Sequence, residues 1–424
     1  MARAWMAVGI AARLAICANM SRSEMGRSVT RKSDLSRCYW SIFILDRIHG
    51  SSFRALQAIS DETILPEMPP CAKQPRISLT LQHVLDKAGD SPVVDENDNG
   101  INSYALQLLS TWGRLMVYLK TIRKGNLEDA WVANSTYQQL KSEMSRFETV
   151  FPEAHRFKYA RFHERTPDGL SRDRVYWASW IFTQCLYHTI HCTLNHPFLH
   201  VVRIHGRQRL RSPSFLQHAT DQAILHSAWV VHVLTLSQER DFTIHDPFIG
   251  HMASMVATAQ FFLRFSKDDN LAKKASDDFD QLRRFVEDMG QDHPHLQHTH
   301  SKLSRLAQLA DPYVDSIQAP SPPKVETALI WDLLDYAVSS SRTISSGGSD
   351  NVELSVNTQF LWPPNQDTSQ QFAVDGRAST TAPTAIFTTP WDHPPFEFDM
   401  ADFSNFPDMS TLTIPGDAWT NGYL

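Results

Sequence analysis

The feature that most constrains the fold is a run of apolar residues at helical spacing. Directly after Gly100, apolar side chains recur every three or four positions, at Ile101, Tyr104, Ala105, Leu108, Leu109, Trp112, Leu115, Met116 and Leu119. This spacing places all of them on one face of an α-helix. The sequence therefore predicts a helix over residues 101–119 whose apolar face packs into a core.

Further segments follow the same pattern. Residues 173–194 are apolar nearly all round and residues 221–237 almost as much, which predicts helices buried on several sides. Helical stripes also run over residues 248–263 and 279–289, whereas strict two-residue alternation is almost absent. Only 16 of the 424 residues are glycine, which disfavours Gly-rich nucleotide-binding folds and β-barrels. The predicted fold class is all-α.

The composition changes near residue 311. Residues 1–310 form the predicted helical domain, residues 311–384 a linker rich in Pro, Ser and Thr, and residues 385–424 a tail. We expect the linker and tail to be mostly disordered. A short helix near residues 325–338 interrupts the linker, and it either docks back on the domain or stands alone.

The charge distribution limits the classes of partner. The chain has 40 basic and 46 acidic residues, a net charge of −6, and residues 378–424 hold six acids without Lys or Arg. Nothing in this balance is typical of binding to a phosphate backbone. The dense basic run at 203–211 could serve as a nuclear import signal or contact phosphate groups. The interpretation as a solvated loop between helices is favoured. No stretch reaches the eighteen apolar residues of a membrane span, and no membrane partner is expected.

The N-terminal segment allows two interpretations. Its spread arginines and the lack of an acid before Glu24 are typical of a mitochondrial presequence. Its apolar residues recur at helical spacing, which favours an amphipathic helix packed in the domain. The predicted inward positions are Trp5, Val8, Ala12, Ala15 and Ile16.

No catalytic motif stands out, and we expect no enzymatic activity. Two groups invite a metal-site interpretation: the first is His188, His191 and Cys192, and the second is His293, His295, His298 and His300. A zinc site needs converging ligands with supporting partners, so core histidines and a polar loop are favoured and no metal or cofactor is expected in this chain. The five cysteines form no C-x-x-C pair, and Cys185 and Cys192 are predicted to be small core residues.

The tail interleaves aromatic and acidic residues. The aromatic positions predicted as activation contacts are Trp391, Phe396, Phe398, Phe403, Phe406 and Trp419. Carboxylates keep such side chains solvated and available to a partner's groove, as in disordered activation domains. Trp331 and Leu334 in the linker helix have a similar setting and are predicted as further activation contacts. The alternative is a tail with incidental aromatics, or a segment that packs on its own domain.

Three segments resemble the fungal-specific transcription factor domain, the helical regulatory region of zinc binuclear cluster transcription factors. The first is similar to the family's Trp, Gly, Ala, Arg helix and contains Trp5, Gly9 and Arg13. The second resembles its R-x-x-W-x-x-x-x-L-D-R block followed by Leu-Pro and contains Arg37, Trp40, Leu45, Asp46, Arg47, Leu65 and Pro66. The third, residues 186–199, resembles the long helix with a Pro-Phe-Leu ending.

The motif residues themselves need no ligand. We expect Leu35, Cys38, Ile42 and Leu45 to pack inward, and Arg47 to suit the dipole at a helix C-terminus capped at Gly50. Asp46 and Arg47 are accordingly predicted to be structural.

The resemblance implies a nuclear regulator of transcription by RNA polymerase II, with an N-terminally partial helical regulatory domain. It implies coactivators as partners of the tail, and a small-molecule effector. The family's six-cysteine cluster, which binds zinc and reads DNA, has no counterpart here, so DNA and zinc binding are expected only in a missing N-terminal module, with a DNA-binding partner as the alternative source of DNA contact. The alternative function is a helical ligand-binding or scaffold protein that does not bind DNA.

Overall fold

The structure is a computed structural model that describes residues 2–20, 29–50, 57–60, 63, 65–68, 74–75, 98–126, 128–200, 212–266, 268–314, 324–325, 327–339 and 354–355. Within these ranges helices dominate, and the only strands are two of two residues each. The elements are α1 (Ala2–Cys17), α2 (Val29–Gly50), α4 (Ile101–Arg123), α5 (Thr136–Val150), η1 (Glu153–His155), α6 (Phe157–Ala160), η2 (Phe162–Glu164), α7 (Pro167–Arg172), α8 (Arg174–Leu194), α10 (Pro213–Glu239), α11 (Pro247–Leu263), α12 (Asp269–Asp292), α13 (Pro294–Val314), β1 (Lys324–Val325), α14 (Thr327–Leu333), α15 (Tyr336–Ser339) and β2 (Leu354–Ser355). The all-α prediction is confirmed.

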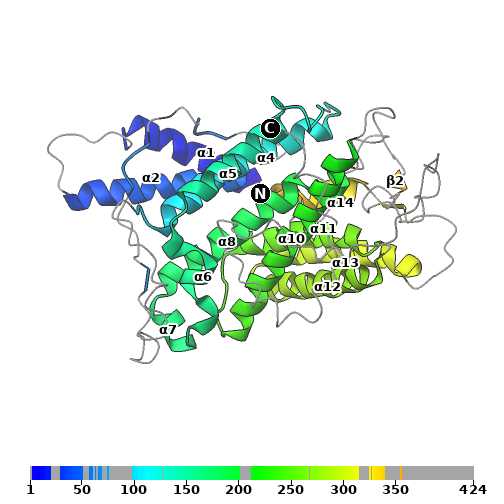
Figure 1. Cartoon of the computed structure of the whole chain (residues 1–424). Coiled ribbons are helices and arrows are strands. Elements are labelled where there is room, and N and C mark those ends of the chain that lie inside the picture. Colours follow the sequence, from blue (N-terminus) through cyan, green and yellow to red (C-terminus); the bar gives the residue numbers. More distant parts are fainter. Residues whose placement is uncertain are drawn as a thin grey trace, which may run out of the picture.

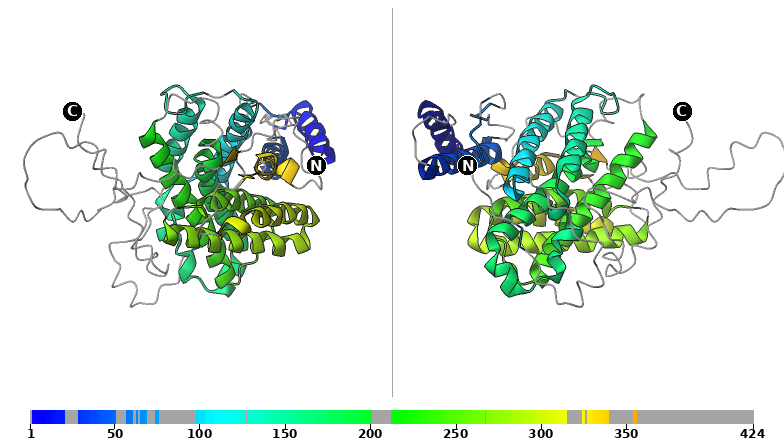
Figure 2. Two further views of the ribbon diagram at one scale, coloured as in Figure 1. Left: turned by 90° about the vertical axis from the view of Figure 1, so that its right-hand side faces the viewer. Right: turned by 60° about the vertical axis from the view of Figure 1, so that its left-hand side comes forward.

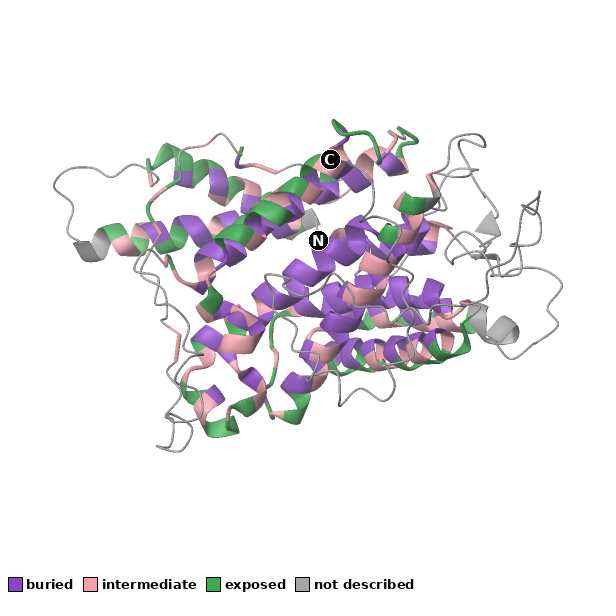
Figure 3. Cartoon of the chain, viewed as in Figure 1, coloured by how far each residue is buried: buried purple, intermediate pink, exposed green. Residues whose placement is uncertain are grey.

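The helices pack around a core centred on α8 and α11. Every residue from Phe248 to Leu263 of α11 is buried, and α8 is buried from Trp180 to Leu194 except at Phe182. Helices α10, α12 and α13 cover α11, while α4 packs on α8 from the other side (Figure 1). Buried residues gather in this central group of helices in Figure 3. The helix predicted over residues 173–194 is therefore confirmed as buried on several sides, and most residues of 221–237 in α10 are buried as well.

Helix α4 follows its sequence pattern closely. All nine residues of the predicted stripe are buried, and the helix continues past residue 119 to Arg123. Its exposed positions, such as Val117, lie between the members of the stripe. The apolar spacing here fixes both the helix and the face that it buries.

Helices α1 and α2 lie side by side at one end of the molecule (Figure 2). Val8, Ala12 and Ala15 of α1 are buried as predicted, but Trp5 and Ile16 are exposed by 39% and 43%. The prediction was wrong at these two positions because α1 is covered along a narrow stripe of small residues only.

The inward face of α2 also differs from the prediction. Cys38 and Leu45 are exposed, and Leu35 and Ile42 are half-buried. The buried positions are Ser36, Tyr39, Trp40, Phe43, Asp46, Arg47, Ile48 and Gly50. The aromatic rings offer more apolar area to bury than the leucines, so they set the rotation of the helix against its neighbours.

The short helix predicted near residues 325–338 forms α14 and α15, and it docks on the domain. Trp331 is 7% exposed and Leu334 is fully buried, so neither is available as an activation contact in this structure, and that prediction is corrected. The Trp331 ring packs edge-on against Phe198 with the centroids 5.0 Å apart. The Lys302 ammonium donates to the Val338 carbonyl at 2.7 Å and lies 3.5 Å from the buried Asp332 carboxylate. The helical domain thus includes these residues as well as α13, which ends at Val314 rather than near 310.

Candidate functional site

The residues of the first resembling segment lie on the surface of α1. The Arg13 guanidinium donates to the Gly9 carbonyl at 3.4 Å, one turn back along the same helix. A Cβ built at Gly9 would meet that guanidinium at an ordinary contact distance of 3.5 Å. These residues shape the exposed side of α1, and they do not converge on a chemical site.

The Asp46–Arg47 pair forms a buried junction at the end of α2. Asp46 accepts hydrogen bonds from the backbone N–H groups of Ala58 and Ile59, at 2.8 and 3.0 Å. Burial raises the pKa of the Asp46 carboxyl, while these two donors and the neighbouring Arg47 act in the opposite direction. The carboxylate therefore fixes the returning chain to the helix.

Arg47 binds the same returning chain from its other side. Its guanidinium donates to the Ile59 carbonyl at 2.9 Å and to Gln57 Oε1 at 2.8 Å, and it is fully buried. It also lies over the Phe43 ring, 4.4 Å from the centroid. A Cβ at Gly113 of α4 would meet Arg47 Cδ at 3.4 Å and would overlap the Gln57 amide, so glycine leaves room for this junction. Arg47 thus ties α2 to the chain around Ile59, a contact beyond the predicted helix-dipole role.

The Trp40 indole also contacts Glu67, the residue that follows Leu65 and Pro66. Trp40 Nε1 donates to the Glu67 carbonyl at 3.5 Å, and the Ser36 hydroxyl donates to the same carbonyl. Arg37 and Leu45, the other members of the block, are exposed. The second resembling segment therefore folds into one unit in which α2 holds the residues that follow it.

A cavity of about 600 Å³ opens beside this unit. Helices α2, α4 and α8 line it together with residues 242–246 and the start of α11. Its apolar wall includes Trp40, Ile44, Leu106, Leu109, Phe182 and Ile249. The volume lies within the range of small-molecule pockets, about 300–1,000 Å³.

Charged groups stand among this apolar lining. Arg37 and Arg174 line the cavity, and Arg174 donates to the Thr243 carbonyl with its guanidinium 4.7 Å from the centroid of the Phe242 ring. Asp246 caps α11 by accepting from the Phe248 N–H at 2.9 Å. Burial raises the pKa of Asp246, against the effects of that hydrogen bond and of His293. The cavity therefore combines an apolar wall with two guanidinium groups and one partly engaged carboxyl.

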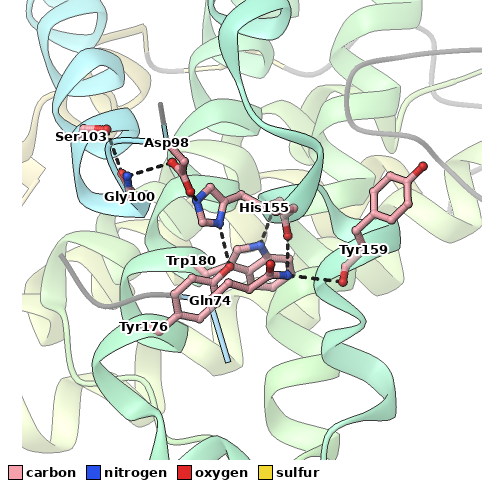
Figure 4. A network of polar contacts seen from close by, with 9 residues as sticks. Gln74, Asp98, Gly100, Ser103, His155, Tyr159, Tyr176 and Trp180 are labelled. Carbon is pink, nitrogen blue, oxygen red and sulfur yellow. Dashed lines mark hydrogen bonds and ion pairs between the residues drawn. The ribbon is translucent and has the colours of Figure 1, made fainter. Parts of the chain in front are cut away.

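A second polar group joins α4 to α8 and is drawn in Figure 4. His155 Nε2 lies 2.9 Å from Asp98 Oδ2, and its Nδ1 lies 2.9 Å from the Tyr176 hydroxyl. The Trp180 indole donates to the His155 carbonyl at 2.8 Å. Burial raises the pKa of Asp98, but hydrogen bonds from His155 and Gly100 outweigh it and hold that pKa below its ordinary value.

Asp98, His155 and Tyr176 together have the groups needed for proton transfer. Their burial does not favour that role. His155 and Tyr176 are each 1% exposed, and neither lines the cavity. A catalytic acid or base must come within hydrogen-bond reach of its substrate. We therefore interpret this network as a tie between the segment before α4, η1 and α8.

The first histidine group faces a histidine of α10. His188 Nδ1 lies 2.8 Å from His226 Nδ1, so the pair shares one proton between two ring nitrogens. His191 stacks on His226 with centroids 4.1 Å apart and lies 3.6 Å from the Glu148 carboxylate. Burial holds the pKa of His188 and of His226 well below the ordinary histidine value, and nearby histidines add to the effect. Cys192 is buried, as is Cys185, which confirms their predicted core positions.

The second histidine group lies at the start of α13. His293 Nε2 contacts the His245 carbonyl at 2.9 Å, and His300 lies 3.6 Å from Glu287. Across the described ranges, no cluster of three or more His, Cys, Asp or Glu side chains has a geometry that would hold a metal ion. Protein contacts thus engage His188 and His191 of the first group and His293 and His300 of the second.

Several predictions fall on residues outside the described ranges. They concern the basic run at 203–211 and the tail at 385–424 with the six aromatic positions predicted as activation contacts. Among the described helices, none combines the length and the apolar character needed to cross a bilayer.

Sequence reasoning missed the cavity and the Asp98–His155–Tyr176 network. Asp98 and His155 are 57 residues apart, and no local pattern links them. The described lining of the cavity likewise comes from five separate stretches of chain. Comparison with known proteins found no matching family model, no matching curated protein and no matching solved structure.

Proposed function

We propose that this chain is the regulatory and activating part of a nuclear regulator of transcription by RNA polymerase II. In this proposal residues 2–339 contain the helical regulatory domain and residues 385–424 recruit coactivators. DNA contact and zinc binding belong to a module outside these 424 residues, or the DNA contact belongs to a partner. The chain itself carries out no catalysis.

The observation that carries the proposal is the way in which the second resembling segment packs. Trp40, Asp46 and Arg47 are buried, and all three hold the chain that follows α2, up to Glu67. Helix α1, which contains the first segment, packs against α2. Trp40, Asp46 and Arg47 thus make contacts within the second resembling segment that a chance likeness between short motifs would not require, so this packing supports the resemblance.

The composition of the tail supports the activating part of the proposal. Its aromatic residues alternate with carboxylates and have no Lys or Arg among their neighbours, which suits docking into an apolar groove of a coactivator. With Trp331 and Leu334 buried in the domain, the six tail aromatics are the remaining activation contacts.

The test transplants residues 385–424 onto an unrelated DNA-binding domain and measures a reporter gene. We expect strong activation that is lost when Trp391, Phe396, Phe398, Phe403, Phe406 and Trp419 are all replaced by alanine. A matched control replaces the threonines of the same segment by alanine and keeps activation. Lack of reporter activity with confirmed expression and nuclear presence would refute the activating role.

The alternative function is a helical ligand-binding or scaffold protein that does not act in transcription. The apolar cavity of about 600 Å³ beside α2 is the observation that favours it. Inactivity of the tail fusion, together with saturable binding of a small molecule by the chain, would favour this alternative.

A further inference from the structure

We propose that the cavity between α2, α4 and α8 binds a small amphipathic carboxylate, a molecule with a medium-length apolar body and one anionic group. The inference deepens the proposed function by naming the chemical class of a ligand. Its test measures binding by the purified chain, so it succeeds or fails independently of the reporter experiment.

The apolar body is matched by the wall of the cavity. Trp40, Leu106, Leu109 and Phe182 present rings and branched carbons from three helices, and the volume of about 600 Å³ suits a ligand of drug-like size. Such walls favour an apolar guest because its transfer from water is favourable by about 25 cal/mol for each Å² that becomes buried.

The anionic group is matched by the two arginines of the lining. In the part of the chain that the structure describes, neither Arg37 nor Arg174 lies within ion-pair distance of a carboxylate. Arg174 is held in place by the Thr243 carbonyl and the Phe242 ring, which leaves its net charge uncompensated. Guanidinium groups bind carboxylates through charge-assisted hydrogen bonds, so these two residues select an anion.

Asp246, the one carboxyl among the described lining residues, does not reverse this selection. Asp246 already accepts the Phe248 N–H as the cap of α11, and burial raises the pKa of its carboxyl. Among the described residues of its lining, the cavity thus has two guanidinium groups against one carboxyl that is already engaged. A cationic ligand would be repelled by both guanidinium groups, whereas the binding of a neutral ligand would be favoured by the apolar wall alone.

The experiment titrates the full chain with decanoate and, separately, with decan-1-ol by isothermal titration calorimetry at neutral pH. We expect decanoate to bind saturably at one site, at least about tenfold more tightly than decan-1-ol, a ratio equivalent to about 1.4 kcal/mol. Equal affinity for the acid and the alcohol would overturn the anionic selection, and the absence of saturable decanoate binding would overturn the site.

Variants locate the site. Ala178 is an exposed residue of α8 that lines the cavity, so Ala178→Trp fills the opening with little risk to the core, and we expect it to abolish decanoate binding. Arg37→Gln should weaken decanoate binding about tenfold and leave decan-1-ol unchanged. Arg172→Gln, an exposed neighbour outside the lining, is the matched control and should behave as wild type.

A last control excludes binding to exposed apolar surface. Leu14 of α1 is 65% exposed and lies on a helix that does not line the cavity. Leu14→Ser should leave decanoate binding unchanged. Wild-type affinity in Ala178→Trp, or lost affinity in Leu14→Ser, would assign the binding to another place and overturn the proposal.

Discussion

Arg47→Met should lower the free energy of unfolding more than most other single substitutions in helix α2. The methionine keeps much of the side-chain volume but removes the guanidinium that binds the Ile59 carbonyl, Gln57 Oε1 and Asp46. Asp46 would then keep a charge that is 1% exposed and has no cation beside it. Breaking a buried pair in this way costs about 3–5 kcal/mol.

The assay is urea unfolding of the full chain followed by circular dichroism, with thermal unfolding as a second readout. A loss of about 3–5 kcal/mol should lower the melting temperature by about 5–9 °C in a domain of this size. Arg37→Met, at an exposed position of the same helix, is the matched control and should change stability by less than about 0.5 kcal/mol.

A double variant separates the buried charge from the lost volume. Asp46→Asn in the Arg47→Met background removes the unpaired carboxylate, so the two changes together should cost less than their sum by about 0.5–3 kcal/mol. The reasoning would be refuted if Arg47→Met alone lowered stability by less than about 1 kcal/mol, or if the two changes were additive.

Three further predictions concern stability. Burial lowers the pKa of His196 to about 3 and of His200 to about 4, below the ordinary value of 6.5. Between these values and pH 6.5, both histidines are therefore protonated in the unfolded chain and neutral in the folded chain. Unfolding free energy should therefore fall by about 1.4 kcal/mol per pH unit for each of them as the pH drops below about 6.5, and His200→Gln should flatten that fall in urea titrations. Asp98→Asn should lower the free energy of unfolding by about 1.5–3 kcal/mol at neutral pH, because it removes the charge-assisted hydrogen bond to His155 shown in Figure 4. An unchanged urea midpoint would contradict this role of Asp98. A chain that ends at residue 345 should have the melting temperature of the full chain. A chain that ends at residue 320 should melt several degrees lower, because Phe198 loses its contact with Trp331. Equal melting temperatures would show that α14 and α15 do not stabilise the domain.

Local periodicity explains which parts of the fold could be predicted. On the inward faces of α4, α8 and α11, apolar residues outnumber polar ones. Their spacing alone therefore identifies each helix and the face that it buries. In α2, apolar and polar residues are spread around the helix without a dominant side. Its rotation is decided by contacts with α1, α4 and the chain near Ile59, which the local pattern does not contain.

The remaining errors and omissions have the same origin. Trp331 has the same composition around it as a solvated activation motif, and only the surface formed by α11, α13 and Phe198 determines that it is buried. Lys302, 30 residues earlier, supplies the cation for Asp332. The cavity and the Asp98–His155 contact likewise depend on segments far apart in the chain, and residue types alone do not predict such distances.

The central claim is that this chain activates transcription when it is brought to a promoter. The most direct measurement fuses all 424 residues to an unrelated DNA-binding domain and compares its reporter activity with that of a fusion truncated after residue 384. The account predicts activation by the full chain and its loss on truncation, at equal protein levels. Equal reporter activity from both fusions, or none from the full chain, would contradict it.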